Sequence, residues 1–263
     1  MGVDARMNVE LYSKVSGKGT PLVVMHGLFG SLENLGMITR RLEDDYEIHA
    51  LDLRNHGRSG HATAMDYPAM AADVVAYLDA QGLDRVALLG HSMGGKTAME
   101  VALANSARVS HLIVADIAPV TYHPRHDAIL EGLSAIDPAQ LGSRQEADAR
   151  LADYVESAGI RQFLLKNLVR GENGLFRWRL NLPAIQACYP QLAAGPTAEG
   201  PFEGPTLFIK GADSKYIQEK HQTEVRRLFP QASLRIISDT GHFLHAEKPE
   251  VFTALCRRFL AEG

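Results

Sequence analysis

The 263-residue sequence predicts an α/β fold, in which helices flank a mostly parallel central sheet. Short apolar runs, typical of buried strands, alternate with longer stretches of helical spacing over most of the chain. One such run, 86–89, leads through a glycine-rich pentapeptide directly into a helix-forming stretch. The segment 119–204 interrupts the alternation once, because it holds helical patterns but no convincing buried strand. These observations predict one α/β domain over 1–263 with a helical insertion.

The elements before the insertion follow in a regular order. A weakly alternating stretch predicts an edge strand over 7–15. Continuous apolar runs, as expected of strands buried on both faces, predict strands over 21–25, 48–53, 86–89 and 112–117. Apolar residues at helical spacing, followed by good helix formers after the pentapeptide, predict helices over 32–42, 66–80 and 92–105.

The insertion itself reads as several helices. We expect them over 124–134, 143–157, 160–168 and about 182–189, with a hairpin-like aromatic stretch over 175–180. The alternation then returns, with strands expected over 206–210 and 234–238 and helices over 216–228 and 249–261. Right-handed crossovers place the turns that follow parallel strands along the carboxyl edge, where α/β sheets bind ligands. We therefore expect 119–204 to form a cap, or lid, over this edge.

The composition argues against several classes of protein. A formal net charge of −4 and a pI near 6.3 offer nothing that attracts polyanions, so we expect no nucleic-acid partner. No apolar run approaches the roughly 20 residues that a membrane-spanning helix needs. Cys188 and Cys256 form neither a disulfide framework nor a metal pattern, which favours a cytoplasmic location. The histidine spacings match no ligand motif, so we expect no metal and no cofactor. The sequence carries no signal of oligomeric state.

Residues 90–94, GHSMG, fit the pattern G-x-S-x-G. This pattern bends a strand sharply into a helix, so that the central residue, Ser92, is exposed at the strand tip. Gly90 and Gly94 have a steric role, because without a Cβ the two flanking segments can pass closely. Between a strand and a helix, the pattern indicates a nucleophilic serine; the alternative is a glycine-rich turn without chemistry.

A nucleophilic serine needs a base within hydrogen-bond reach, and the base needs an orienting acid. His242 follows the last expected strand and precedes the last expected helix. It therefore occupies the final place in the chain order serine, acid, histidine. His245 is the nearby alternative, but its place next to the final helix favours a packing or capping role.

Six stretches together resemble the bacterial YbfF-type esterases and their relatives, which are serine esterases of the α/β-hydrolase fold. The stretches are HGLFGSLENLG (26–36), DLRNHGRS (52–59), GHSMGGK (90–96), DIAPVTYHPRHD (116–127), QFLLKNL (162–168) and GHFLHAEKPE (241–250). The resemblance extends from about residue 20 to the end of the chain. It implies the α/β-hydrolase fold, carboxylic ester hydrolysis and a helical lid.

The acid of the expected triad has two candidates. The usual α/β hydrolase carries an aspartate at the end of a G-x-x-D turn, but this turn holds Ser214, with Asp213 one residue early. A shift of one residue in a tight turn redirects a side chain strongly. The resemblance implies that Asp116, at the end of the preceding strand in the sheet, is the acid. Asp213 and a weakly assisted Ser92–His242 pair are the alternatives.

The expected oxyanion hole consists of two main-chain N–H groups. One belongs to Met93, which follows the candidate nucleophile at a helix N-terminus. The resemblance implies that the residue after His26-Gly27, which is Leu28, supplies the other, with Phe29 as the neighbouring alternative. His26 itself is expected to hold this turn in shape.

Other residues have expected roles around the site. Lys96 lies in the first turn of a helix, where the helix dipole disfavours a cation, so we expect it to have a carboxylate partner. The loop of Arg54, Asn55 and His56 is expected to brace the sheet edge. The residues expected to contact substrate are Phe29, His91, Tyr122, His123, Phe163, Trp178 and Phe243. Arg125 and His126 share the stretch of Tyr122 and His123, and for these four residues the expected role is to line the pocket or to anchor the lid. For Phe163 and Trp178, packing in the core of the lid is the alternative.

The sequence and the resemblance together predict a carboxylic ester hydrolase that forms an acyl-enzyme with small to medium-chain esters. The expected partner is thus a small-molecule ester. Thioester hydrolysis, acyl transfer and carbon–carbon bond hydrolysis use the same triad and are alternatives. A catalytically silent binding protein of the same fold is a further alternative, against which the serine and histidine argue.

Overall fold

A computed structural model describes residues 8–262 of the chain. Seven strands form one sheet in the order β1-β3-β2-β4-β5-β8-β9. β1 is antiparallel to β3, and the other neighbours are parallel. The strands are β1 (Ser13–Ser16), β2 (Thr20–Met25), β3 (Tyr46–Leu51), β4 (Val86–His91), β5 (Val109–Ala115), β8 (Thr206–Gly211) and β9 (Ala232–Ile237). The prediction of a mostly parallel α/β sheet is confirmed.

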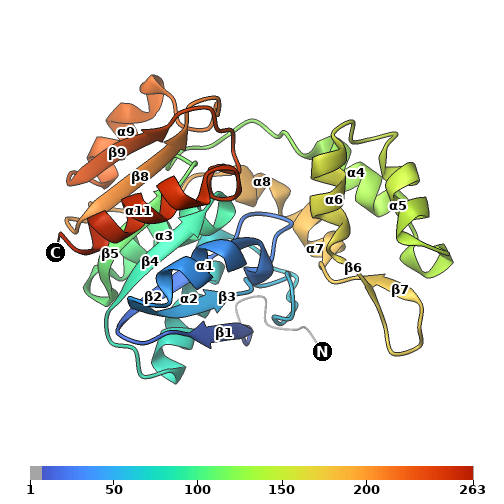
Figure 1. Ribbon diagram of the computed structural model, residues 1–263, viewed down its shortest axis with the longest axis horizontal. Coiled ribbons are helices and arrows are strands. Elements are labelled where there is room, and N and C mark those ends of the chain that lie inside the picture. Colours follow the sequence, from blue (N-terminus) through green and yellow to red (C-terminus); the bar gives the residue numbers. More distant parts are fainter. Residues whose placement is uncertain (1–7, 263) are drawn as a thin grey trace.

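Helices cover both faces of this sheet (Figure 1). On one face α1 (Gly36–Leu42) packs with α11 (Pro249–Leu260), and on the other α2 (Tyr67–Ala80) packs with α3 (Met93–Ala104). Along β2, Leu22 and Val24 join the apolar cluster of α1 and α11, whereas Val23 and Met25 join that of α2 and α3. Successive strand side chains point to opposite faces, so a strand covered on both sides must be apolar throughout.

The segment 119–204 connects β5 to β8, the next strand in the sheet. Figure 1 shows α4 to α7 gathered to one side of the main sheet, whereas α8 lies back against it. The hydroxyl of Tyr67, on α2, donates to the carbonyl of Leu192, on α8, at 2.6 Å. The elements are α4 (Asp127–Ala135), α5 (Arg144–Leu151), α6 (Ala158–Leu165), β6 (Leu168–Arg170), β7 (Phe176–Trp178), α7 (Leu182–Ala187) and α8 (Tyr189–Ala193).

Some elements differ from their predicted bounds. The edge strand expected over 7–15 is the short β1, and residue 7 lies outside the described residues. The helix expected over 216–228 begins with a 3-10 turn, Glu219–His221, and continues as α9 (Gln222–Leu228). The helix expected over 32–42 likewise begins with a 3-10 turn, Leu32–Leu35. A short helix, α10 (Leu244–Glu247), was not predicted, because four residues are too few to show periodicity.

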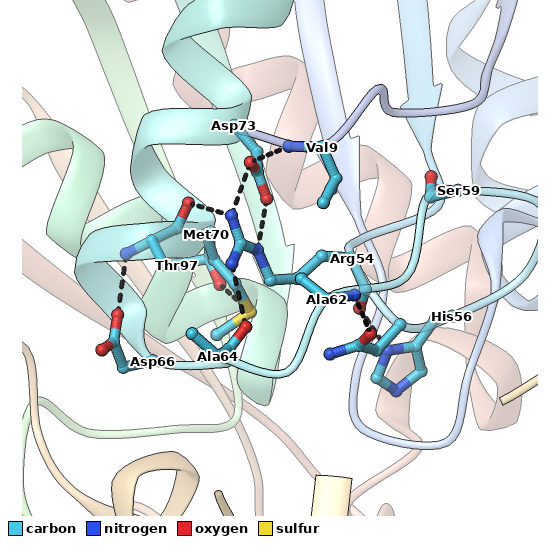
Figure 2. A network of polar contacts seen from close by, with 12 residues as sticks. Val9, Arg54, His56, Ser59, Ala62, Ala64, Asp66, Met70, Asp73 and Thr97 are labelled. Atoms are coloured by element: carbon cyan, nitrogen blue, oxygen red, sulfur yellow. Dashed lines mark hydrogen bonds and ion pairs between the residues drawn. The ribbon is translucent and has the colours of Figure 1, made fainter. Parts of the chain in front are cut away.

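A buried ion pair holds the loop that follows β3 (Figure 2). Arg54 and Asp73 are each only 1% exposed, and Nε and Nη2 of Arg54 donate to the Asp73 carboxylate at 2.5 and 2.7 Å. The carboxylate also accepts the Val9 N–H at 2.8 Å. The pair ties the loop to α2, and the same loop carries His56 to the turn that follows β2.

Candidate active site

The chain passes from β4 into α3 through a strained turn at Ser92. Ser92 has φ 52° and ψ −117°, a conformation that residues with a side chain rarely adopt. A Cβ on Gly90 would lie 2.1 Å from the carbonyl oxygen of Gly94, and one on Gly94 would lie 2.5 Å from that of His26. The two glycines of the motif are therefore required by close backbone contacts, as their spacing predicts.

Asp116 and His242 are joined by a hydrogen bond. Nδ1 of His242 lies 2.8 Å from Oδ2 of Asp116, which is fully buried directly after β5. The carboxylate also accepts the N–H of Gly211 at 3.1 Å and the hydroxyl of Ser214. Because a carboxylate can only accept, Nδ1 of the neutral imidazole carries the proton and Nε2 is the basic nitrogen.

The turn after β8 supports Asp116 without supplying an acid of its own. Asp213 is exposed, and its N–H donates to the carbonyl of Thr240 at 3.0 Å. Ser214 occupies the position of the usual aspartate and donates its hydroxyl to Asp116, while its Oγ accepts the Tyr216 N–H at 3.2 Å. The geometry thus favours Asp116 over Asp213 as the partner of His242.

Two neutral histidines hold the turn after β2. Nε2 of His56 accepts the Phe29 N–H at 3.1 Å, and Nε2 of His26 accepts the Leu53 N–H at 3.0 Å. The other nitrogen of each ring faces a main-chain carbonyl oxygen, to which it donates. Burial lowers the pKa of His26 to about 4 and that of His56 to about 3, so both rings are neutral, as these bonds require.

This arrangement distinguishes the two candidate oxyanion donors in the turn. The Phe29 N–H is occupied by His56, whereas the Leu28 and Met93 N–H groups have no hydrogen-bond acceptor within residues 8–262. Met93 is the first residue of α3, where an N–H has no partner inside the helix. From the segment 119–204, Asn167 donates to the Phe29 carbonyl at 2.7 Å and holds the turn from its other side.

Ser92, Leu28 and Met93 line a small cavity of about 50 Å³. Tyr122 and His123 also line it, which agrees with their predicted place. Arg125 and His126, from the same stretch of the sequence, line it as well. Sequence reasoning did not propose the remaining lining residues as substrate contacts; they are Tyr67, Lys96, Ile117, Tyr189, Leu192, Ala193 and Tyr216.

Tyr216 has the most direct contact with the candidate base among these additional residues. Its ring centre lies 4.2 Å from that of His242, with 30° between the planes. Tyr216 follows Ser214 by two residues, so the turn that replaces the usual acid also supplies this ring. This short spacing from Ser214 is the one sequence feature that points to Tyr216 as a site residue. Spacing does not give the direction of a side chain after a turn, so the ring contact with His242 could not be predicted.

Five of the residues that were predicted to contact substrate do not line this cavity. Phe29 is buried and packs edge-on against His126, with 5.9 Å between ring centres. His91 is buried beneath the site, and its Nε2 faces the carbonyl oxygen of His242 at 2.8 Å. Phe163 and Phe243 contact each other, with their ring centres 5.4 Å apart.

Trp178 shows this difference from the cavity lining most clearly. It lies on β7, where it pairs with Leu168 of β6, and its Nε1 donates to the carbonyl of Ile136 at 3.4 Å. The side chain therefore packs within the segment 119–204 and does not reach the cavity that Ser92 lines. An aromatic residue in a short hairpin packs against its own small core more readily than against a distant site.

Lys96 has no carboxylate partner in the described part of the chain, contrary to the expectation. It is 2% exposed, and its Nζ donates to the carbonyl oxygens of Ala193, at 3.1 Å, and Ala194. It also lies over the rings of Tyr67 and Tyr122 at 5.5 and 4.8 Å. The carbonyl end of a helix attracts a cation, so the end of α8 takes the place of the expected carboxylate. Burial lowers the pKa of Lys96 to about 7.

Two negative findings complete the description of residues 8–262. They contain no group of three His, Cys, Asp or Glu residues arranged to hold a metal ion. They also contain no helix that is both long and apolar enough to cross a membrane.

A serine on a strained turn, a histidine bonded to a buried carboxylate, and two free N–H groups are the parts that acyl transfer requires. They lie at the carboxyl edge of a parallel sheet, where β2, β4 and β5 end. The chain belongs to the alpha/beta hydrolase family, which it matches over residues 22–255. The predicted fold is thereby confirmed.

Within this family, the chain is similar to several individual proteins. The chain is 41% identical to Esterase YbfF of Escherichia coli strain K12 over 242 residues, which cover 92% of this chain and 93% of that protein. It is 39% identical to the sn-1-specific diacylglycerol lipase ABHD11 of Mus musculus over 260 residues, covering 95% and 84%. A marine microorganism esterase of solved structure superimposes with a TM-score of 0.94 at 38% identity, covering 96% and 100%. The resemblance to YbfF-type esterases is confirmed.

Proposed function

We propose that this chain hydrolyses carboxylic esters with small to medium acyl chains, using Ser92, His242 and Asp116 as a triad. The proposal depends above all on the 2.8 Å contact between His242 Nδ1 and the buried Asp116, beside the strained turn that presents Ser92. The printed names of the relatives, an esterase and a diacylglycerol lipase, support ester substrates. A lid role for 119–204, a cytoplasmic location and a reaction without a cofactor belong to the same proposal.

The proposed reaction uses the groups described for this site. Nε2 of His242 removes the proton of Ser92 as Oγ attacks the ester carbonyl, and Asp116 stabilises the imidazolium that forms. The Leu28 and Met93 N–H groups donate to the oxyanion; losing one such donor typically costs on the order of 10²–10³ in rate. The imidazolium then protonates the leaving alcohol. A water molecule, deprotonated by the same histidine, then attacks the acyl-enzyme. The imidazolium returns the proton to Ser92 Oγ as the acyl–oxygen bond breaks, which releases the acid and free Ser92.

The size of the cavity supports the shorter acyl chains. The cavity beside Ser92 has a volume of only about 50 Å³, and Tyr122 and Tyr216 are among the residues that line it. A series of p-nitrophenyl esters of increasing acyl length tests this part of the proposal. We expect kcat/KM to be highest at short to medium chains. An optimum at long chains would instead favour a lipase-like cleft; the mouse relative is named a diacylglycerol lipase.

Labelling with a fluorophosphonate probe tests the central claim. We expect the folded protein to be labelled at Ser92 and the Ser92→Ala variant to be unlabelled and inactive. Ser110→Ala is the matched control, because Ser110 lies on β5 outside the cavity and should leave labelling unchanged. Folded wild-type protein that resists the probe, or that is labelled at another residue, would contradict the proposal.

A further inference from the structure

His91 lies immediately before Ser92, at the variable position of the pentapeptide, and the reaction described above does not use it. The side chain is 4% exposed and is not part of the cavity wall. Its Nε2 lies 2.8 Å from the main-chain carbonyl oxygen of His242, 151 residues further along the chain. Since a carbonyl oxygen only accepts, Nε2 carries the proton and donates it. The residue before the candidate nucleophile is thus bonded to the backbone of the candidate base.

The surroundings of His91 keep its ring in this position. Its centre lies 4.7 Å from the ring centre of His242 and 4.4 Å from that of His245. The turn after β2 also packs closely against this ring. A Cβ on Gly27 would lie 3.0 Å from His91 Nδ1, so a residue larger than glycine at position 27 would crowd the imidazole. Burial and the two neighbouring histidines lower the pKa of His91, which keeps the ring neutral and its single N–H on Nε2.

Without His91, the Asp116 contact would be the one hydrogen bond left to His242 among the described residues. The Asp116 contact fixes Nδ1 of His242, but a ring held at one nitrogen can still pivot as its loop shifts. The bond from His91 fixes the main chain of the same residue to the end of β4, where Ser92 begins the turn. One bond thus restrains the ring of His242 and the other restrains its main chain.

We infer that His91 is a positioning residue, whose Nε2–H holds the backbone of His242 so that the base stays aligned with Ser92. This inference rests on the proposed function, because it assigns His91 to the same reaction. Misplacement of reacting groups by about 1 Å can cost on the order of 10²-fold in rate. Loss of the bond should therefore lower kcat by about 10- to 100-fold and leave KM nearly unchanged, because His91 does not line the cavity.

The substitutions His91→Gln, His91→Asn and His91→Leu separate the bond from the packing. The amide nitrogen of glutamine lies as many bonds from Cα as Nε2 of histidine, so His91→Gln should keep kcat within about fivefold of wild type. Asparagine is polar but too short, and leucine fills the space without donating; both should show the full loss. His245→Leu changes a residue that packs on the same ring without bonding to His242, and should stay within about threefold.

Two readouts distinguish positioning from a general loss of structure. We expect the rate of fluorophosphonate labelling of Ser92 to fall with kcat in His91→Asn and His91→Leu while the melting temperature stays near that of wild type. Independently of activity, amide hydrogen exchange of 239–243 should quicken in these two variants and not in His91→Gln.

The outcomes separate this inference from the proposed function. If wild-type protein neither turns over p-nitrophenyl butanoate nor reacts with the probe, the proposed function fails, and exchange at 239–243 still decides whether the tether exists. If wild type is active but His91→Asn or His91→Leu retains kcat within threefold, or glutamine rescues no better than leucine, the positioning role is wrong. Should His91→Leu not fold, the comparison of His91→Asn with His91→Gln decides.

Discussion

Replacing Asp116 by asparagine should separate the two carboxylates that the sequence leaves as candidates. Asp116 is fully buried and faces three donors: His242 Nδ1, the Gly211 N–H and the Ser214 hydroxyl. An amide keeps one acceptor oxygen but puts an NH₂ group in place of the other. If the NH₂ group faces His242, Nδ1 becomes the acceptor and Nε2 carries the proton, so the ring can no longer act as a base. In serine hydrolases this change costs roughly 10⁴ in kcat, or about 5.5 kcal/mol of transition-state stabilisation.

The assay is steady-state release of p-nitrophenolate from the butanoate ester by Asp116→Asn and by Asp213→Asn. We expect kcat of Asp116→Asn to fall by roughly 10³–10⁴, with circular dichroism and melting temperature verifying that it is folded. Asp213 is exposed, so Asp213→Asn should stay within about twofold of wild type. A larger loss in Asp213→Asn than in Asp116→Asn would refute this reasoning and assign the acid to the turn after β8.

Three further outcomes follow from buried polar groups. Arg54→Met should lower the free energy of unfolding by about 3–5 kcal/mol in urea titration, because it leaves the Asp73 carboxylate buried without its partner; adding Asp73→Leu should recover part of the loss. His56→Leu frees the Phe29 N–H and loosens the oxyanion turn, so kcat should fall about tenfold at constant KM. Burial lowers the pKa of Lys96 from 10.5 to about 7, so between these values the unfolded chain binds a proton that the native protein lacks. Stability should therefore rise with pH in this window, by on the order of 5 kcal/mol in all, and Lys96→Met should lack this rise. Equal pH slopes of the unfolding free energy of the two proteins, measured by urea titration, would contradict this prediction.

The sheet and the strained turn could be predicted from the sequence because their causes are local. A strand covered on both faces is apolar throughout, so β2, β4 and β5 appear as continuous apolar runs. Gly90 and Gly94 are separated by the spacing that the bend requires, and the structure shows the backbone contacts that exclude a Cβ at both. The place of His242 follows from chain order alone.

Only the tertiary structure shows which residues contact the candidate acid, Asp116. Asp116 and Asp213 both follow strands, and nothing in the sequence gives the direction of either side chain. In the fold, β5 and β8 lie side by side, so Ser214 and the Gly211 N–H both reach the carboxylate of Asp116. Asp213, one residue earlier than Ser214, is turned to solvent.

Long-range contacts decided the remaining roles, because they join residues whose separation carries no periodic signal. The sequence determined that Lys96 would need a negative partner, but only the fold shows that this partner is the carbonyl end of α8, about 97 residues away. It placed His91 beside Ser92 and suggested substrate contact, whereas the fold turns the ring toward the backbone of His242. Local sterics and hydrophobic patterning thus determine the strands and the turn that bears Ser92. The packing of distant segments decides which side chains meet there.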